Sequence, residues 1–310
     1  MKITEVAAAV ILREDGCFLL GQRAADTFYS GYWEFPGGKV EAGETPYQAL
    51  CRELHEELEI EVLAASPWIV REHVYEHAHV RLHFFRVTAW QGELRDHVHA
   101  ALAWQQAAAL SVTPMLPANA PVLAALQLPP VYGISHAWQI GIAAQLAALD
   151  QALAGGLKLV QLREGVLPEG QRESFVSAAV LRCQQQAARV LVNGDAQLAR
   201  ACGADGLHLP AQQLMALERR PPFPLVAASC HDRHELEHAA RIGCDFAMLG
   251  SVHPTASHPG QAGMGWHGFT EQVAGLPLPV YAIGGLGMND LAAAQTAGAH
   301  GIAAIRSAWN

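Results

Sequence analysis

The feature that most constrains the fold is a regular alternation of short apolar runs and alanine-rich stretches through residues 129–310. Strands that alternate with helices form parallel sheets, and eight such units are the number that closes a (β/α)8 barrel. We therefore predict a TIM barrel for residues 129–310. The eight apolar runs lie at residues 131–135, 157–163, 190–193, 206–209, 225–229, 246–251, 280–284 and 301–305.

Residues 1–128 lack this rhythm and predict a separate mixed α/β domain. An apolar strand at residues 5–12, a turn at Asp15-Gly16 and a second strand at residues 17–22 predict a hairpin. The run at residues 80–90 predicts a further strand. The prolines that follow a short apolar helix at residues 120–126 predict a domain boundary near residues 128–130.

One helix in this first part has a well-marked start, which places it at residues 46–58. Thr45 suits the N-cap and Pro46 the first helical position. Gln48 completes a capping box with Thr45. With the start of the helix fixed, the helical period assigns each of its side chains to a face.

Composition excludes several classes of protein. The chain has 20 Lys and Arg against 29 Asp and Glu, a net charge of -9, which argues against stable binding of duplex nucleic acid. The longest early apolar run, residues 6–12, is too short to span a membrane, and no cleavage signature follows it. The six cysteines form no C-x-x-C pair, which favours reduced thiols and a cytoplasmic protein.

Three glutamates mark the helix as a candidate metal site. Glu53, Glu56 and Glu57 share one helical face, where like charges repel one another. Arg52 alone cannot neutralise three carboxylates, so the face favours a hard cation, Mg²⁺ or Mn²⁺. Mg²⁺ held by few carboxylates commonly takes substrate phosphates as further ligands, which points to hydrolysis at a phosphoryl group. The R-E-x-x-E-E pattern alone is also typical of a solvated acidic face.

The wider pattern resembles the Nudix box, G-x5-E-x7-R-E-U-x-E-E-x-G-U, where U is apolar. One position departs from it, because Glu59 stands where the box has its last glycine. The resemblance implies a Nudix hydrolase with an α/β/α fold and a mixed sheet. The positions in register are Gly38, Glu44, Arg52, Glu53, Leu54, Glu56, Glu57 and Ile60.

Residues 3–128 further resemble the MutT-type 8-oxo-dGTP diphosphatases, which convert a nucleoside triphosphate and water into monophosphate and pyrophosphate. The resemblance implies that Glu53, Glu56 and Glu57 bind Mg²⁺ with the carbonyl of Gly37, and that Glu53 helps to deprotonate the attacking water. Asn119 would read the purine, and the alternative is a turn residue between prolines. Phe35 would wall the base pocket, or be plain core. The implied substrate-binding residues are Arg23, which engages phosphate, Glu34, Phe35, Pro36, Gly37 and Asn119.

A later loop departs from this group. Val98 stands where a further glutamate is expected, and Asp96, His97 or His99 are the candidates to replace it. Two histidine clusters are present, and without an H-E-x-x-H motif or paired cysteines they favour solvated or pocket-lining side chains over zinc. The clusters are His73, His77, His79 and His83, and His231, His234 and His238.

Residues 130–308 resemble thiamine phosphate synthase and its relatives. Gly284, Gly285 and Ser307 match the phosphate-binding position of such barrels. Lysines and metal carboxylates of that family are missing, and Asp195 is the nearest replacement carboxylate. We expect a barrel that binds a phosphorylated ligand or is structural, and the alternative is a bifunctional enzyme that also makes thiamine phosphate. The substituted positions are Gly165, Gly194, Gln197 and His258.

Overall fold

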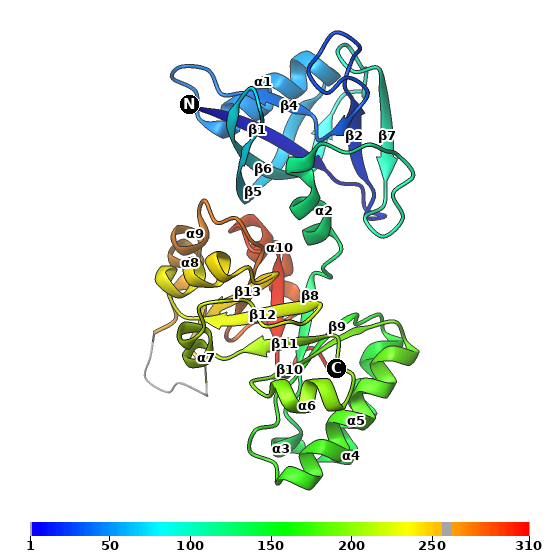
Figure 1. Ribbon diagram of the computed structural model, residues 1–310, viewed down its shortest axis with the longest axis vertical. Coiled ribbons are helices and arrows are strands. Elements are labelled where there is room, and N and C mark those ends of the chain that lie inside the picture. The colour runs from blue at the N-terminus through cyan, green and yellow to red at the C-terminus, as the bar shows by residue number, and fades with distance from the viewer. Residues whose placement is uncertain (1, 256–261, 310) are drawn as a thin grey trace. The chain divides into compact units, whose positions relative to one another are not determined.

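The computed structural model describes residues 2–255 and 262–309. The chain forms two compact units, Met1–Gln127 with Gly275–Pro277, and Leu128–Ala274 with Leu278–Asn310 (Figure 1). The first unit contains two sheets and the second a closed barrel, so the predicted fold class is confirmed. No helix within the described ranges is long and apolar enough to cross a membrane.

The first unit is built around β1. A four-stranded sheet has the order β4-β1-β6-β5, in which β1 runs parallel to β6 and antiparallel to β4. A three-stranded antiparallel sheet has the order β3-β2-β7. The strands are β1 (Ile3–Ile11), β2 (Phe18–Gln22), β3 (Trp33–Glu34), β4 (Gly37–Lys39), β5 (Glu61–Val74), β6 (His79–Gln91) and β7 (Ala101–Gln105).

The predicted hairpin is only partly present. Leu12 and Phe18 form a single antiparallel bridge, and the N–H of Arg13 donates to the carbonyl of Cys17. β1 and β2 nevertheless belong to different sheets, because β4 and β6 already pair with both edges of β1. The turn has a local sequence signal, whereas the competition for the edges of β1 involves strands far along the chain.

Helices cover both faces of β1, which gives the first unit three layers. Ala7, Ala9 and Ile11 face one core and Ala8 and Val10 the other, as expected for alternating side chains. The first core packs against α1 (Pro46–Leu58) and the second against α2 (Ala120–Leu126), which follows a 3-10 turn at Pro117–Asn119. The helix contacts come from Ala49, Leu50, Leu54 and Leu58 of α1, and Val122, Leu123 and Ala125 of α2.

Helix α1 has the predicted bounds, and the residue that caps its end is strained. Thr45 is the N-cap and forms the predicted capping box with Gln48. Glu59, the residue in place of the Nudix glycine, is the C-cap and adopts left-handed backbone angles of φ 54° and ψ 30°. A residue other than glycine is disfavoured there because its Cβ crowds the backbone.

We expect Glu59→Gly to raise the free energy of unfolding of the first unit by about 1 kcal/mol, because glycine adopts this conformation without strain. The lost ion pairs of Glu59 with Arg95 and His97 are exposed and contribute little. Urea unfolding of native chain, Glu59→Gly and Glu59→Ala would test this. The prediction is wrong if the alanine variant, which loses the same ion pairs but keeps a Cβ, is as stable as the glycine variant.

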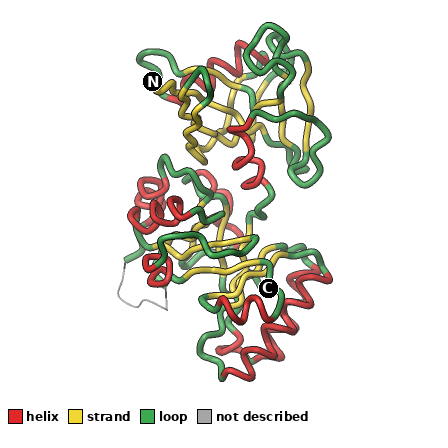
Figure 2. The backbone as a smooth tube through the Cα atoms, viewed as in Figure 1, coloured by secondary structure: helices red, strands yellow, loops and turns green. Residues whose placement is uncertain are grey.

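The second unit is a closed barrel of eight parallel strands with helices around it (Figure 2). All eight predicted strands are present, and the closing order is β10-β11-β12-β13-β14-β15-β8-β9. The strands are β8 (Val131–Ile134), β9 (Leu159–Leu162), β10 (Arg189–Asn193), β11 (Gly206–Leu209), β12 (Leu225–Cys230), β13 (Phe246–Gly250), β14 (Val280–Ile283) and β15 (Gly301–Ala304).

Large apolar side chains fill the barrel interior. Tyr132, Phe246 and Tyr281 are fully buried there and pack ring against ring. The interior is therefore a packed core, and space for a ligand is left only at the strand ends. The helices are α3 (Ala137–Ile140), α4 (Ile142–Ala154), α5 (Glu169–Gln185), α6 (Ala196–Ala201), α7 (Ala211–Ala216), α8 (Arg233–Ile242), α9 (Gly265–Val273) and α10 (Leu291–Thr296), which follows a 3-10 turn at Met288–Asp290.

Candidate active site

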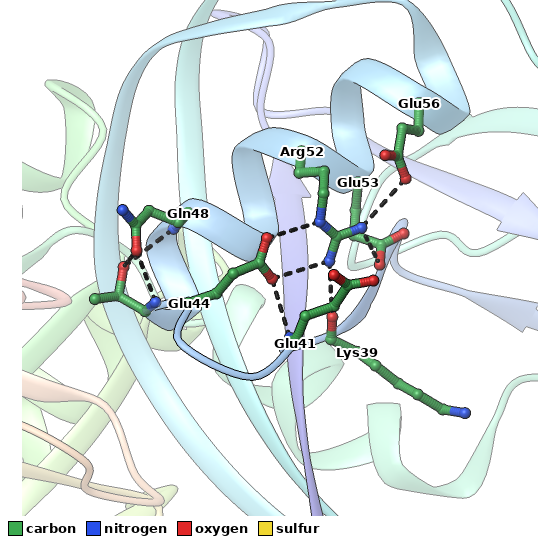
Figure 3. A network of polar contacts seen from close by, with 8 residues as sticks. Lys39, Glu41, Glu44, Gln48, Arg52, Glu53 and Glu56 are labelled. Carbon is green, nitrogen blue, oxygen red and sulfur yellow. Dashed lines mark hydrogen bonds and ion pairs between the residues drawn. The ribbon is translucent and has the colours of Figure 1, made fainter.

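The polar face of α1 is organised by Arg52 (Figure 3). Its guanidinium donates to Glu44 at 2.8 and 3.1 Å, to Glu53 at 2.9 Å, and to Glu56 at 3.2 Å. It also donates to the carbonyl of Lys39 at 2.9 Å. The hydrogen bond with Glu44, and then that with Glu53, raises the pKa of Arg52 above its ordinary value. Arg52 is therefore a fixed positive charge that holds two of the three predicted metal-binding carboxylates.

Glu57, the third carboxylate, has a different environment. Its Oε2 accepts a hydrogen bond from the N–H of Gly37 at 3.2 Å. Burial is the largest of the causes that raise the pKa of Glu57 to about 8. The nearby carboxylates of Glu53, Glu34 and Asp96 act in the same direction. Several acidic groups thus crowd around a poorly solvated carboxylate, an arrangement that a bound cation would stabilise.

Two consecutive glycines bring the backbone against these carboxylates. Gly37 has a φ of 137°, and a Cβ there would lie 2.2 Å from the carbonyl oxygen of Ala7. A Cβ on Gly38 would lie 2.2 Å from the carboxyl carbon of Glu53. Only glycine at these positions permits the close approach of β4 to both β1 and α1.

The same glycines line a cleft of about 550 Å³ in the first unit. The predicted residues Arg23, Glu34, Gly37 and Gly38 contribute to its wall. Lys39 and His77, a member of the histidine cluster for which solvated or pocket-lining side chains are expected, also lie in the wall. Three aromatic wall residues were not predicted from the sequence: Phe28, Tyr29 and Tyr75. The cleft and the carboxylate face of α1 therefore meet at the two glycines.

Arg23 lies in the wall of this cleft and is held there by hydrogen bonds. Its Nη1 donates to both carboxylate oxygens of Glu34, at 2.6 and 2.8 Å, and its Nε donates to the carbonyl of Phe28 at 2.7 Å. Burial raises the pKa of Glu34 in spite of this ion pair. Nη2 of Arg23 has no partner among the described residues, so it can still donate to a phosphate.

Aromatic side chains supply a surface on which a flat base can stack. Phe28 is 68% exposed, and its ring lies parallel to that of His77 with 4.2 Å between the centroids. Tyr29 and Tyr75 pack on the same histidine. The only sequence signal for this surface is an aromatic pair, Phe28-Tyr29, close after Arg23.

Three predicted substrate-binding residues lie outside the cleft wall. Phe35 is 4% exposed and packs in the core against Phe18 and Phe84, so it occupies the plain core position. Asn119 is 2% exposed, and its side-chain N–H points to the carbonyl of Trp33 at 3.4 Å. The carbonyl of Pro36 accepts from the N–H of Ala9 in the sheet.

The predicted phosphate position of the barrel is a cavity at the strand ends. Gly284, Gly285 and Ser307 line a space of about 360 Å³ together with Arg306. An adjoining cavity of about 190 Å³ shares Gly284 and is lined by Arg163, Ser229 and His231, among others. Each cavity therefore has one arginine in its wall, Arg306 in the first and Arg163 in the second, and suits an anion.

Positions that depart from the synthase pattern do not recover its missing charges. Asp195, the predicted replacement carboxylate, caps α6 by accepting from the N–H of Leu198 and pairs with Arg172 at 3.3 Å. Gly165 has open space around it, so nothing there excludes a longer side chain. His258 lies outside the described residues.

Comparison with known families assigns a family to each unit of the chain. A model of the NUDIX domain matches residues 7–125, and a model of thiamine monophosphate synthase matches residues 131–308. The chain belongs to both families. Its first unit is a Nudix hydrolase, and its second unit is a thiamine phosphate synthase-like barrel.

Curated relatives agree with this division. A CTP pyrophosphohydrolase of Escherichia coli (strain K12) is 43% identical over 125 residues, which are 40% of this chain and 92% of that protein. An 8-oxo-dGTP diphosphatase of the same organism is 36% identical over 127 residues, 41% of this chain and 98% of that protein. A putative thiamine-phosphate synthase of Geobacter sulfurreducens is 35% identical over 182 residues, 56% of this chain and 84% of that protein.

Nudix hydrolases generally need a divalent metal, and the donor set of this unit fits one. Carboxylate oxygens are the ligands that hard cations prefer, and α1 offers them from Glu53, Glu56 and Glu57. Among the described residues, no three His, Cys, Asp or Glu side chains converge as ligands as they stand. Arg52 holds Glu53 and Glu56 instead. A cation bound at α1 would therefore compete with Arg52 for these two carboxylates. In the described ranges, neither histidine cluster brings three such side chains together.

We expect low pH to destabilise the synthase-like barrel through His208. Burial lowers the pKa of His208 to about 3, while its ring contacts Tyr132 at 3.2 Å and Ser229 at 2.8 Å. The unfolded chain, with a pKa near 6.5, binds this proton first, so the contribution is intact above pH 6.5 and falls by about 2 kcal/mol at pH 5. Urea unfolding at pH 7 and pH 5 should show a smaller fall for His208→Gln. An equal fall would contradict the assignment.

Proposed function

We propose that the Nudix unit is a Mg²⁺-dependent diphosphatase that converts 8-oxo-dGTP to monophosphate and pyrophosphate, and so removes an oxidised guanine nucleotide from the precursor pool. One observation carries the proposal: the cleft and the α1 carboxylates share Gly37 and Gly38. A triphosphate in the cleft would thereby lie beside the metal-binding face. The 36% identity to an 8-oxo-dGTP diphosphatase supports this substrate class.

In the proposed reaction each residue has a defined task. Glu53, Glu56 and Glu57 would hold Mg²⁺, which supplies positive charge to the phosphates and lowers the pKa of bound water. Glu53, packed against Gly38, accepts the proton of the attacking water. Lys39 and the free Nη2 of Arg23 meet phosphate oxygens along the cleft wall.

The base would lie toward the aromatic end of the cleft. Phe28 and His77 present exposed ring surface for stacking. Asn119, although buried outside the cleft wall, would hydrogen-bond the purine once its long contact to the carbonyl of Trp33 is broken. Stacking tolerates any base, so the choice among bases falls to hydrogen bonds such as this one.

A second candidate substrate is CTP, because the identity to a CTP pyrophosphohydrolase is 43%. Turnover of 8-oxo-dGTP, dGTP and CTP with Mg²⁺, with the products separated by anion exchange, distinguishes the two. Preference for 8-oxo-dGTP over dGTP supports the first candidate. Preference for CTP overturns it, and inactivity on all three leaves other nucleoside diphosphate derivatives as the class to screen.

For the barrel we propose binding of a phosphorylated small molecule without synthesis of thiamine phosphate. The cavity at Gly284, Gly285 and Ser307 has the lining to bind an anion. The glycines at positions 165 and 194 lack the charged side chains of the synthase family, which argues against the synthase reaction. Stabilisation by inorganic phosphate without turnover of pyrimidine pyrophosphate and thiazole phosphate would support this. Product formation would establish the bifunctional alternative.

We also propose that the protein works in the cytoplasm. All six cysteines are free, and burial raises the pKa of Cys183 and of Cys244 to about 12, so these thiols are inert and protonated. Unpaired cysteines are typical of a reducing compartment, where nucleotide precursors are also found.

A further inference from the structure

The loop of residues 23–32, which connects β2 to β3, places an aromatic ring on the turn between β5 and β6. The ring of Phe28 lies on that of His77, with 4.2 Å between the centroids and 10° between the planes. The turn that carries His77 is closed by a hydrogen bond from the N–H of Tyr75 to the carbonyl of Ala78 at 2.8 Å. Phe28 and His77 both line the cleft of the Nudix unit. Two separate segments of the cleft wall therefore meet ring on ring.

The two rings of this stack differ in their freedom to move. His77 also packs on Tyr29 and on Tyr75, with centroid separations of 5.9 and 5.7 Å. The Phe28 side chain is 68% exposed, and exposed side chains change rotamer rapidly. Phe28 therefore covers a ring on which a flat base could stack, and it can move aside while His77 stays in place.

The backbone beneath Phe28 is held by Arg23. Nε of Arg23 donates to the carbonyl of Phe28 at 2.7 Å, and Nη1 donates to both carboxylate oxygens of Glu34. The two ends of the loop are joined by backbone hydrogen bonds, from Arg23 to Tyr32 at 2.9 Å and from Gly31 to Arg23 at 3.0 Å. The Phe28 ring can therefore turn on a loop whose backbone is fixed.

Tyr29, the next residue, is in a strained conformation that its neighbours maintain. Its φ of 57° lies in the left-handed region, which residues other than glycine rarely adopt. Its ring packs on those of Tyr32 and Tyr75, with centroid separations of 5.2 and 5.3 Å. Strain of this kind persists where the surrounding structure holds it, and it is concentrated at binding sites.

We propose that Phe28 is a specificity-determining residue of the Nudix unit. Its ring moves off His77, and the base of the nucleotide enters between the two rings, so that both faces of the base are covered. A purine has two fused rings and buries more surface between Phe28 and His77 than a pyrimidine does, so this clamp favours purines. The inference rests on the nucleotide substrate of the proposed function and adds how the size of the base is selected.

The test is calorimetric titration of the full chain with 8-oxo-dGMP, CMP and inorganic pyrophosphate in the presence of Mg²⁺. We expect Phe28→Ala to raise the Kd of 8-oxo-dGMP about tenfold and that of CMP about threefold, because loss of one aromatic stacking partner has an effect of this order. The Kd of pyrophosphate, which has no base, should not change. Phe28→Trp keeps a flat ring and should bind like the native chain, whereas Phe28→Leu keeps only apolar bulk and should bind as weakly as Phe28→Ala.

The matched control is Leu63→Ala, which removes an apolar side chain that is 61% exposed on β5. The inference is overturned if Phe28→Ala binds 8-oxo-dGMP as tightly as this control. It is also overturned if Phe28→Ala binds more tightly than the native chain, because Phe28 would then only block His77. Equal losses for 8-oxo-dGMP and CMP, or a native chain that binds neither, would overturn it as well.

Hydrolysis of 8-oxo-dGTP by the native chain tests the proposed function separately. If the native chain hydrolyses CTP instead, the proposed function fails, and a larger loss for 8-oxo-dGMP than for CMP in Phe28→Ala would still support the clamp. Melting temperatures show which variants are folded. Should Phe28→Ala fail to fold, native affinity of Phe28→Leu for 8-oxo-dGMP would overturn the inference.

Discussion

Glu53→Gln is expected to lower kcat for the preferred nucleoside triphosphate about 10³-fold, the range found when a proton-accepting group is removed. The glutamine amide neither accepts a proton nor carries the charge that a cation needs. It keeps the shape of glutamate, and its oxygen can still accept from Nη1 of Arg52, as Glu53 does at 2.9 Å. The melting temperature should therefore change little. Pyrophosphate release under single-turnover conditions measures the effect without interference from product release.

The control for this experiment is Glu61→Gln, which removes a carboxylate from an exposed position at the start of β5. It should retain native turnover. Retention of more than about a tenth of native kcat by Glu53→Gln would assign the proton-accepting role to another group. Because Glu57 has a raised pKa and lies beside the same glycines, it would be the next residue to change.

Local signals explain why parts of the fold could be predicted from the sequence. The bounds of α1 follow from Thr45, Pro46 and Gln48, which act within a single helical turn. The eight barrel strands could be predicted because each is a short apolar run, which is visible without knowing the strands beside it. The three glutamates of α1 share a face because helical spacing alone decides it.

The inside of the cleft could not be predicted in this way. Glu34 faces the cleft and Phe35 faces the core, but β3 has two residues and is too short to show any alternation. Phe28 meets His77 only because a loop and a distant strand pair come together. Contacts of this kind depend on tertiary register, which no local pattern reveals.

The charge around the glutamates of α1 also depends on tertiary contacts. The pKa of Glu57 depends on burial and on Asp96, which approaches from a loop 39 positions further along the chain. From the sequence alone, Asp96, His97 and His99 are equal candidates for the missing loop carboxylate. In the structure the three side chains differ, because His97 contacts Glu59 at 2.6 Å and His99 contacts Asp96 at 3.1 Å.

Gly38→Ala is expected to lower turnover about 100-fold, because displacement of a catalytic group by about 1 Å has an effect of this size. Its Cβ would lie 2.2 Å from the carboxyl carbon of Glu53. The obstructing atom is the end of a flexible side chain, so Glu53 moves and the fold persists. Turnover and urea unfolding measured on the same preparation should show a large loss of kcat with a small loss of stability.

Gly37→Ala is the matched comparison, because the adjacent glycine is constrained by backbone instead. Its Cβ would lie 2.2 Å from the carbonyl oxygen of Ala7, and its φ of 137° is strained for alanine. We expect a loss of about 3 kcal/mol in the free energy of unfolding. Equal free energies of unfolding for Gly37→Ala and Gly38→Ala would contradict this prediction. Native turnover of Gly38→Ala would show that the position of Glu53 against β4 does not affect catalysis. It would remove the geometric basis for the proposed role of Glu53.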